Sequence, residues 1–164
     1  MKDYRALSRK LSLALDVANI IPWRWDLRAH LIFCDIQCSN SDLSNLEQPM
    51  PKRSLEISEE KYFSKIRKSD RERLRSVCEA LIRGDIDKVK EEFLIYRSGR
   101  SNPNFDWIEV QAIVEKRDER GCPIVLTGSS LRITERKRIE EELLRARDKA
   151  EESNRLKSTF LANM

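Results

Sequence analysis

Apolar residues recur with different periods along the chain, and each period predicts a different kind of element. Over residues 3–18 they are spaced three and four apart, which predicts an amphipathic helix that Pro22 closes. Over residues 20–27 they take every second position, which predicts a half-buried strand, and a second short strand follows around residues 31–33. Residues 36–54 are rich in serine, asparagine and proline and are expected to form a loop.

Two helices are predicted in the middle of the chain. Ser58 precedes two acidic residues, as an N-cap does, and a helix over residues 58–66 is expected to follow. Residues 69–72 have the composition of a capping box, which opens a second helix over residues 69–83. Apolar side chains in this helix recur at the spacing of one face, and Gly84 supplies a left-handed stop.

The next part of the chain predicts three strands joined by hairpins. They cover residues 89–97, 105–116 and 123–133, with turn residues between them. Strands joined by hairpins pair antiparallel, and helices inserted between strands have to cover one face of the sheet. The pattern therefore predicts an α+β domain with a five-stranded antiparallel sheet and helices on one face.

The C-terminal residues return to a helical pattern. Small and apolar residues step four and three apart along a heptad seam with one polar member, and the seam consists of Ile139, Leu143, Ala146, Ala150, Ser153, Lys157 and Phe160. A small domain cannot bury such a stripe on so long a helix, so we expect a coiled coil between two copies of the chain. The expected organisation is an N-terminal amphipathic helix at 1–19, a folded domain at 20–134 and a long helix at 135–164.

Composition removes several classes of function. The 164 residues carry 37% charged side chains but a net charge of only +4, and the two signs are interleaved, which argues against nucleic-acid binding. No apolar run reaches the length of a transmembrane helix, and the N-terminus lacks the apolar core of a signal peptide. We therefore expect a cytoplasmic domain without a membrane segment, although a longer parent protein could carry an anchor elsewhere.

Cysteine and histidine are too few and too scattered for several kinds of active site. His30 is the only histidine, and the four cysteines are Cys34, Cys38, Cys78 and Cys122. A four-ligand zinc site and a histidine-dependent catalytic triad are both disfavoured by these numbers. We expect no metal site and four reduced cysteines, most of them packed in the core.

Three segments resemble parts of a bacterial sensor histidine kinase. Trp107-Ile108-Glu109 resembles the tryptophan-containing penultimate strand of PAS sensor domains, and residues 128–137 resemble the closing strand, which typically ends Gly-x-x-x-Asp-Ile-Thr-Glu-Arg-Lys. Residues 150–164 resemble the lead-in to the phospho-acceptor box of a histidine kinase. Two positions depart from the family: Arg132 replaces the aspartate of the closing motif, and only Asp70 matches the His-Pro-Asp-Asp that precedes the family's long helix.

The resemblance implies the sensory and signal-transmitting part of a two-component sensor histidine kinase, possessing a PAS domain and the start of a dimerisation domain. Its partners would be a second copy of the chain, a downstream kinase core and a response regulator. The chain contains neither the acceptor histidine nor a glycine-rich nucleotide-binding segment, so we expect no catalytic residues and no kinase activity from the chain itself. The alternative is a stand-alone PAS module that dimerises and regulates a partner in trans.

The resemblance to PAS domains implies that a ligand, if one is bound, lies between the sheet and the helices. The candidate ligand-binding residues are Trp23, Trp25, Phe33, Cys78 and Trp107. The helical segment lacks the histidine that haem would need, and Cys78 lies mid-helix rather than in a flavin-type motif, so no haem or flavin cofactor is expected and core packing is the competing interpretation. Binding of an unidentified small ligand is the other interpretation of these residues.

The closing strand continues into the long helix without a glycine or proline to absorb motion. Arg132, Ile133, Thr134 and Glu135 are therefore the candidate signal-transmission residues. Thr134 is expected to cap the helix, and Glu135 suits the positive end of the helix dipole.

Overall fold

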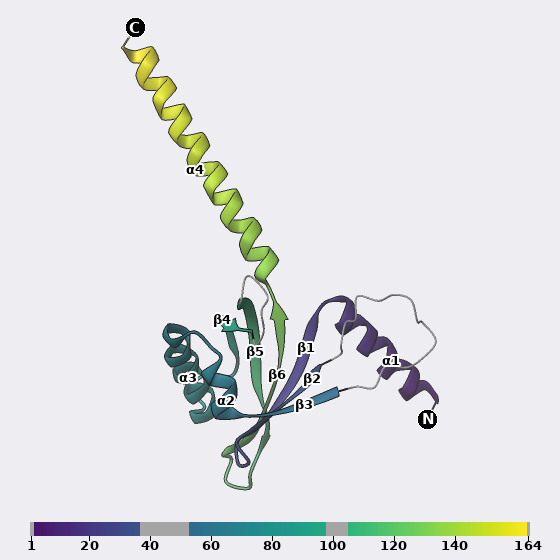
Figure 1. Ribbon diagram of the computed structural model, residues 1–164. Coiled ribbons are helices and arrows are strands. Elements are labelled where there is room, and N and C mark those ends of the chain that lie inside the picture. The colour runs from purple at the N-terminus through teal and green to yellow at the C-terminus, as the bar shows by residue number, and fades with distance from the viewer. Residues whose placement is uncertain (1, 37–52, 98–104, 164) are drawn as a thin grey trace. The chain divides into compact units, whose positions relative to one another are not determined.

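The computed structural model describes residues 2–36, 53–97 and 105–163, which form two compact units. The first unit ends at Arg132 and contains every strand of the described ranges, and the second begins at Ile133 and consists of one long helix. Helix α1 spans Lys2–Val17 and precedes the sheet in the chain (Figure 1). None of the helices in the described ranges combines the length and the apolar character that crossing a membrane requires.

Across the described residues the sheet has six strands in the order β3-β2-β1-β6-β5-β4, and all neighbouring strands are antiparallel. The strands are β1 (Ile20–Asp26), β2 (Leu31–Ile36), β3 (Arg53–Ser58), β4 (Val89–Tyr96), β5 (Phe105–Arg117) and β6 (Pro123–Arg132). The α+β class and the antiparallel pairing agree with the prediction, but the expected number of five strands is wrong. The missed strand is β3, whose alternating Leu55 and Ile57 follow directly on a long polar stretch.

Helices α2 (Glu59–Ser64) and α3 (Lys68–Arg83) cover one face of the sheet (Figure 1). Ser58 caps α2 as predicted, since its Oγ accepts a hydrogen bond of 3.3 Å from the backbone N–H of Lys61. Gly84 ends α3 with a φ of 85°, a conformation that glycine adopts without steric cost. The predicted capping box is wrong: Arg67 takes the N-cap position, so Ser69 lies inside the first turn.

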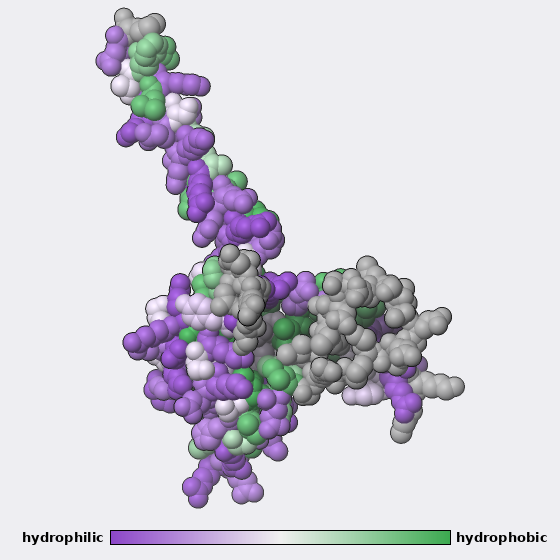
Figure 2. Space-filling model, viewed as in Figure 1, coloured by the Kyte–Doolittle hydropathy of each residue, from purple (hydrophilic) through white to green (hydrophobic). Residues whose placement is uncertain are grey.

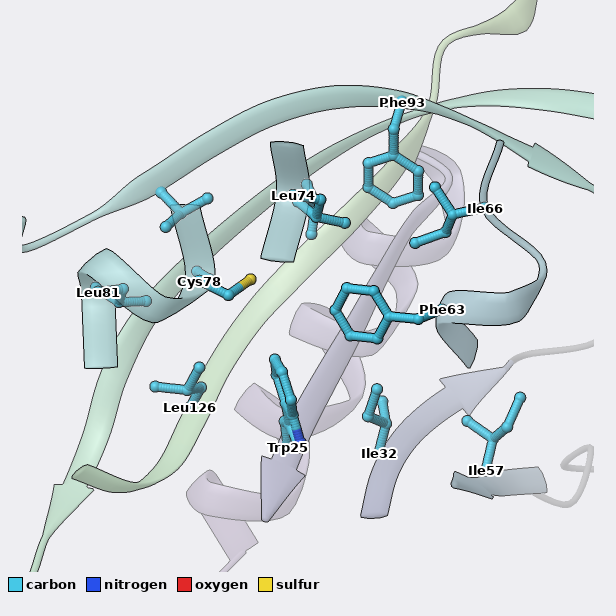
Figure 3. Packing of buried hydrophobic residues seen from close by; sticks show 13 residues of the cluster. Trp25, Ile32, Ile57, Phe63, Ile66, Leu74, Cys78, Leu81, Phe93 and Leu126 are labelled. Carbon is cyan, nitrogen blue, oxygen red and sulfur yellow. The ribbon is translucent and has the colours of Figure 1, made fainter. Parts of the chain in front are cut away.

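The core lies between the two helices and the covered face of the sheet. Phe63, Leu74 and Cys78 come from the helices and pack toward Trp25 and Ile32 of the strands (Figure 3). Strand β5 places Ile108, Val110, Ala112 and Val114 on this same face, as its alternating pattern predicts. Removal of these apolar side chains from water stabilises the packing of the helices on the sheet.

The connection from α1 to β1 differs from the expectation. Helix α1 already ends at Val17, and Asn19 adopts a φ of 55° before the strand begins. Pro22, expected to close the helix, lies inside β1 opposite Ser129 of β6. Pairing of β1 with β2 starts only at Trp23, so proline occupies a position where the strand is paired on one side.

Helix α4 spans Thr134–Ala162, a length of 29 residues, and none of its side chains is buried. Ile133 takes the N-cap position, so the expected capping role of Thr134 is wrong. Ion pairs such as Arg147–Glu151, with an Nε–Oε1 distance of 3.0 Å, follow the helix surface at a spacing of four residues. Figure 2 shows a mostly hydrophilic helix surface on which hydrophobic side chains are interspersed.

Candidate functional site

A cavity of about 210 Å³ lies between the covered face of the sheet and the helices. All six strands, both covering helices and the residue after α2 contribute to its wall. The lining residues are Ile21, Trp23, Trp25, Ile32, Cys34, Leu55, Ile57, Tyr62, Phe63, Lys65, Leu74, Cys78, Val89, Phe93, Ile95, Ile108, Val110, Ala112 and Ser130. Figure 3 shows part of this wall, with Phe63, Leu74 and Cys78 above Trp25 and Ile32.

Secondary-structure periodicity explains which residues face the cavity. Trp23 and Trp25 are two apart on β1, so both project from the same face of the sheet. Leu74 and Cys78 are four apart on α3 and therefore share the helix face that meets the sheet. The wall is consequently almost entirely apolar, with a few polar atoms set into it.

The uncharged polar side chains of the wall fall into two groups. Tyr62 and Ser130 are hydrogen-bonded to each other across the cavity wall, and burial raises the pKa of Tyr62 above its ordinary value. The indole Nε1 atoms of Trp23 and Trp25 are buried and have no acceptor among the residues that the structure describes. Buried tryptophan N–H groups normally find a partner, so two unpaired ones in one cavity need an explanation.

Two cysteines of the wall are reduced thiols in apolar surroundings. Cys78 is buried and Cys34 is partly buried, and neither forms a disulfide. Burial raises the pKa of the Cys78 thiol to about 12, and the nearby charges of Glu59 and Glu91 act in the same direction. A thiol with so high a pKa stays protonated at neutral pH and is a poor nucleophile, which favours a packing role.

The structure brings together three of the five residues predicted to bind a ligand. Trp23, Trp25 and Cys78 line the cavity. Phe33 does not, because it alternates with Ile32 and Cys34 along β2 and therefore belongs to the opposite face. The same alternation places Trp107 on the outer face.

Trp107 lies on β5, next to the edge strand β4, and contacts Arg67. The guanidinium carbon of Arg67 lies 5.5 Å from the centroid of the Trp107 ring, a cation–π geometry. The backbone of Arg67 donates a hydrogen bond of 2.9 Å to the carbonyl of Leu94, the residue paired with Trp107. This tryptophan therefore helps to attach the start of α3 to the sheet.

Sequence reasoning missed three polar residues of the cavity wall: Tyr62, Lys65 and Ser130. They come from α2, from the link after it and from β6, three segments that are remote from one another in the chain. The alternation along β6 predicts which face Ser130 occupies, but no local signal in the sequence places Tyr62 and Lys65 in the same cavity as Trp23.

Gly128, the first residue of the closing motif, is required by close packing on this face. It pairs with Trp23 on one side and with Ala112 on the other. A Cβ atom at this position would lie 1.9 Å from the backbone oxygen of Gln111 and 2.6 Å from Cζ2 of Trp23. The absence of a side chain therefore allows the Trp23 ring to lie against the strand.

The predicted signal-transmission residues follow one another at the end of β6. Arg132 is the last residue of the strand and pairs with Ile108, which lines the cavity. Thr134 and Glu135 are the first two residues of α4, so Ile133 alone separates the strand from the helix. Their role in transmission stays a prediction.

Solved structures with the same fold identify it as that of PAS sensor domains. A sensory box histidine kinase/response regulator from Burkholderia thailandensis E264 aligns with a TM-score of 0.59 and 21% identity, covering 87% of this chain and 98% of that one. The N-terminal domain of a diguanylate cyclase with PAS/PAC sensor from Marinobacter aquaeolei aligns with a TM-score of 0.51 and 18% identity, covering 72% of this chain and 98% of that one. The sequence matches no protein-family model and no curated protein.

These likenesses confirm the PAS domain predicted from the sequence motifs at the level of the fold. Identities of 21% and 18% support a shared fold but not a shared function. The signalling output and the ligand therefore have to be argued from the residues of this chain.

Proposed function

We propose that the chain is the sensory and signal-transmitting part of a sensor histidine kinase. The observation that carries the proposal is the continuity between the cavity and the long helix. Strand β6 contributes Ser130 to the cavity wall, and it ends only two residues before α4 begins at Thr134. A change in the cavity that moves β6 would therefore act directly on the first turn of α4.

The second element of the proposal is a dimer through α4. On the predicted seam, Ile139, Leu143 and Phe160 are 55%, 69% and 67% exposed within a single chain. Pairing two such helices would remove these side chains from water. Burial of apolar side chains in the seam is the main driving force for coiled-coil formation. Exposed Tyr4, Leu7 and Leu11 on α1 supply a further apolar surface that a second copy could cover.

The third element is the way in which the signal travels. The residues from Ser129 to Glu135 include no glycine and no proline, so no position between strand and helix is especially free to absorb a rotation. A displacement of β6 would then turn or tilt both helices of the dimer. The downstream effect would be a change in how an acceptor histidine is presented to the kinase core.

The choice of output rests on residues 150–164. The PAS fold also occurs in the diguanylate cyclase named above, so the fold does not select the output. The resemblance of these fifteen C-terminal residues to the lead-in of a phospho-acceptor box favours a histidine kinase over a cyclase. Regulation of a separate partner by a stand-alone module is the alternative, and it predicts no phosphorylation in cis.

Phosphorylation with labelled ATP tests the proposal. A protein that continues from α4 into its kinase core should acquire an acid-labile label on a histidine located beyond Met164. The 164-residue chain alone should remain unlabelled under the same conditions. An unlabelled longer protein, or acid-labile label on His30, would contradict the histidine-kinase assignment.

A further inference from the structure

The polar groups of the wall residues that lack an acceptor are hydrogen-bond donors, and the two indole Nε1 atoms among them are covered by protein atoms rather than open to the cavity. The indole N–H groups of Trp23 and Trp25 lack acceptors within the described part of the chain, and Trp25 is only 6% exposed. The ammonium group of Lys65 brings three more donors and no acceptor. The hydroxyls of Tyr62 and Ser130 are already hydrogen-bonded to each other.

The charge of the wall is equally one-sided. Lys65 is the only charged residue among the described residues that line the cavity, and no aspartate or glutamate is present there. Lys65 is half-buried and forms no ion pair with any part of the chain that the structure describes. Its backbone is fixed from both sides, since its N–H donates to the carbonyl of Tyr62 at 3.1 Å and its carbonyl accepts from Tyr96 at 2.9 Å.

We propose that the cavity binds a small apolar monocarboxylate and that Lys65 receives the carboxylate. This inference rests on the proposed sensory function and names the ligand class of its site. An ionised carboxylate is an acceptor-only group with two oxygens and a negative charge, which complements a wall whose one charged group, the Lys65 ammonium, is a donor-only cation. The remaining wall is apolar and requires an apolar body.

Other ligand chemistries fit the wall less well. An amine would add a second cation to a cavity without an anion, and an alcohol would leave the charge of Lys65 unpaired. A phosphate ester carries up to two charges, of which a single lysine would balance one. The volume also restricts size, because 210 Å³ corresponds to about seven non-hydrogen atoms at roughly 30 Å³ each, close to the size of hexanoate.

The three tryptophans provide a direct readout in the full chain. In a protein labelled with ¹⁵N-tryptophan, each indole N–H gives one NMR signal, and Trp→Phe variants assign them. Hexanoate, hexan-1-ol and hexylamine are matched six-carbon probes with three different head groups. We expect hexanoate to shift the signals of Trp23 and Trp25 while that of Trp107, on the outer face, stays in place.

Substitutions at position 65 test the charge. Lys65→Met should weaken hexanoate binding by about tenfold or more, to the level of hexan-1-ol, because it removes a charge-assisted hydrogen bond. Lys65→Arg should retain most of the affinity. Lys68→Met, a change at an exposed lysine outside the cavity wall, is the matched control and should leave the affinity unchanged.

Several results would overturn the inference. They are equal affinity for hexanoate and hexan-1-ol, an unchanged affinity in Lys65→Met, preference for hexylamine, and no cavity signal shifted by any probe. None of these results changes the outcome expected in the phosphorylation and dimerisation experiments. A wrong ligand class can therefore be distinguished from a wrong proposed function. Supporting results are a preference for the carboxylate that is lost with Lys65 and kept with arginine.

Discussion

The carboxylate of Asp70 accepts a hydrogen bond of 3.1 Å from the backbone N–H of Leu94, which connects the first turn of α3 to the edge strand β4. Arg67 and Arg73 approach the same carboxylate at 3.0 Å and 3.3 Å. Burial alone would raise the pKa of Asp70, but hydrogen bonds from Arg67, Leu94 and Arg73 outweigh it and hold the pKa below its usual value. Asp70 therefore stabilises the attachment of the helix to the sheet.

Replacing Asp70 by asparagine should lower the free energy of unfolding at pH 7 by about 1–3 kcal/mol, the usual loss for a buried charged hydrogen-bond group. Because the folded pKa is depressed, this contribution is present above the unfolded pKa of about 3.9 and is lost as the pH falls through the folded pKa. Urea unfolding at pH 7 and pH 3 should show the gap between native and Asp70→Asn protein narrowing at pH 3.

Asp85→Asn is the matched control for this prediction. Asp85 also pairs with an arginine, Arg83, at 3.0 Å, but its side chain is exposed. Exposed pairs contribute about 0–1 kcal/mol, so this variant should be close to native. Equal losses in the two variants would show that the buried link to Leu94 has no special importance.

Gly128→Ala should be strongly destabilising, because the new methyl group would meet the backbone of Gln111 and the ring of Trp23. Overpacking of this kind typically costs about 1–3 kcal/mol, and here the strands also have to separate. The change should alter the tryptophan fluorescence of the folded protein. Gly121→Ala is the comparison: its φ is 82° and it has open space around it, so it should cost about 1 kcal/mol without a fluorescence change.

Cys78 should resist thiol reagents in the folded protein. Its pKa of about 12 leaves almost no thiolate at pH 8, whereas Cys122 is exposed. Mass spectrometry after brief treatment with a maleimide at pH 8 should find Cys122 modified and Cys78 intact, and unfolding in urea should remove the difference. Modification of both cysteines at equal rates in the folded chain would contradict the buried position of Cys78.

The dimer predicts different effects at two adjacent leucines of α4. Leu143 lies on the heptad seam and Leu144 does not, although both are more than half exposed in the single chain, at 69% and 54%. Leu143→Glu should abolish dimerisation at tens of micromolar in sedimentation experiments, because it places a charge in the apolar seam. Leu144→Glu should leave the dimer intact, and equal effects would refute the proposed seam.

The sequence predicts those parts of the fold that depend on local periodicity. Alternation along β1 and β5 identified the residues that face the helices, and the spacing of Leu74 and Cys78 identified the buried face of α3. Strand β3 was missed because a short strand after a polar stretch offers only Leu55 and Ile57 as signals.

The assignment of Asp70 to a capping box was wrong for a related reason. Its partner Leu94 lies 24 residues further along the chain, and only the tertiary fold brings the two together. The same limit applies to Lys65, whose relevance depends on its lining the same cavity as Trp23 and Trp25.

The central claim, that α4 transmits a rotation from β6 to a kinase core, is tested most directly by inserting residues near Glu142 in a protein extended through that core. One inserted residue turns the downstream helix by about 100°, whereas seven return it to within about 20° of its original phase. Autophosphorylation should therefore change most after an insertion of one residue, change less after four, which leave the helix about 40° out of phase, and return toward the native rate after seven. Equal rates for all three insertions would contradict the claim.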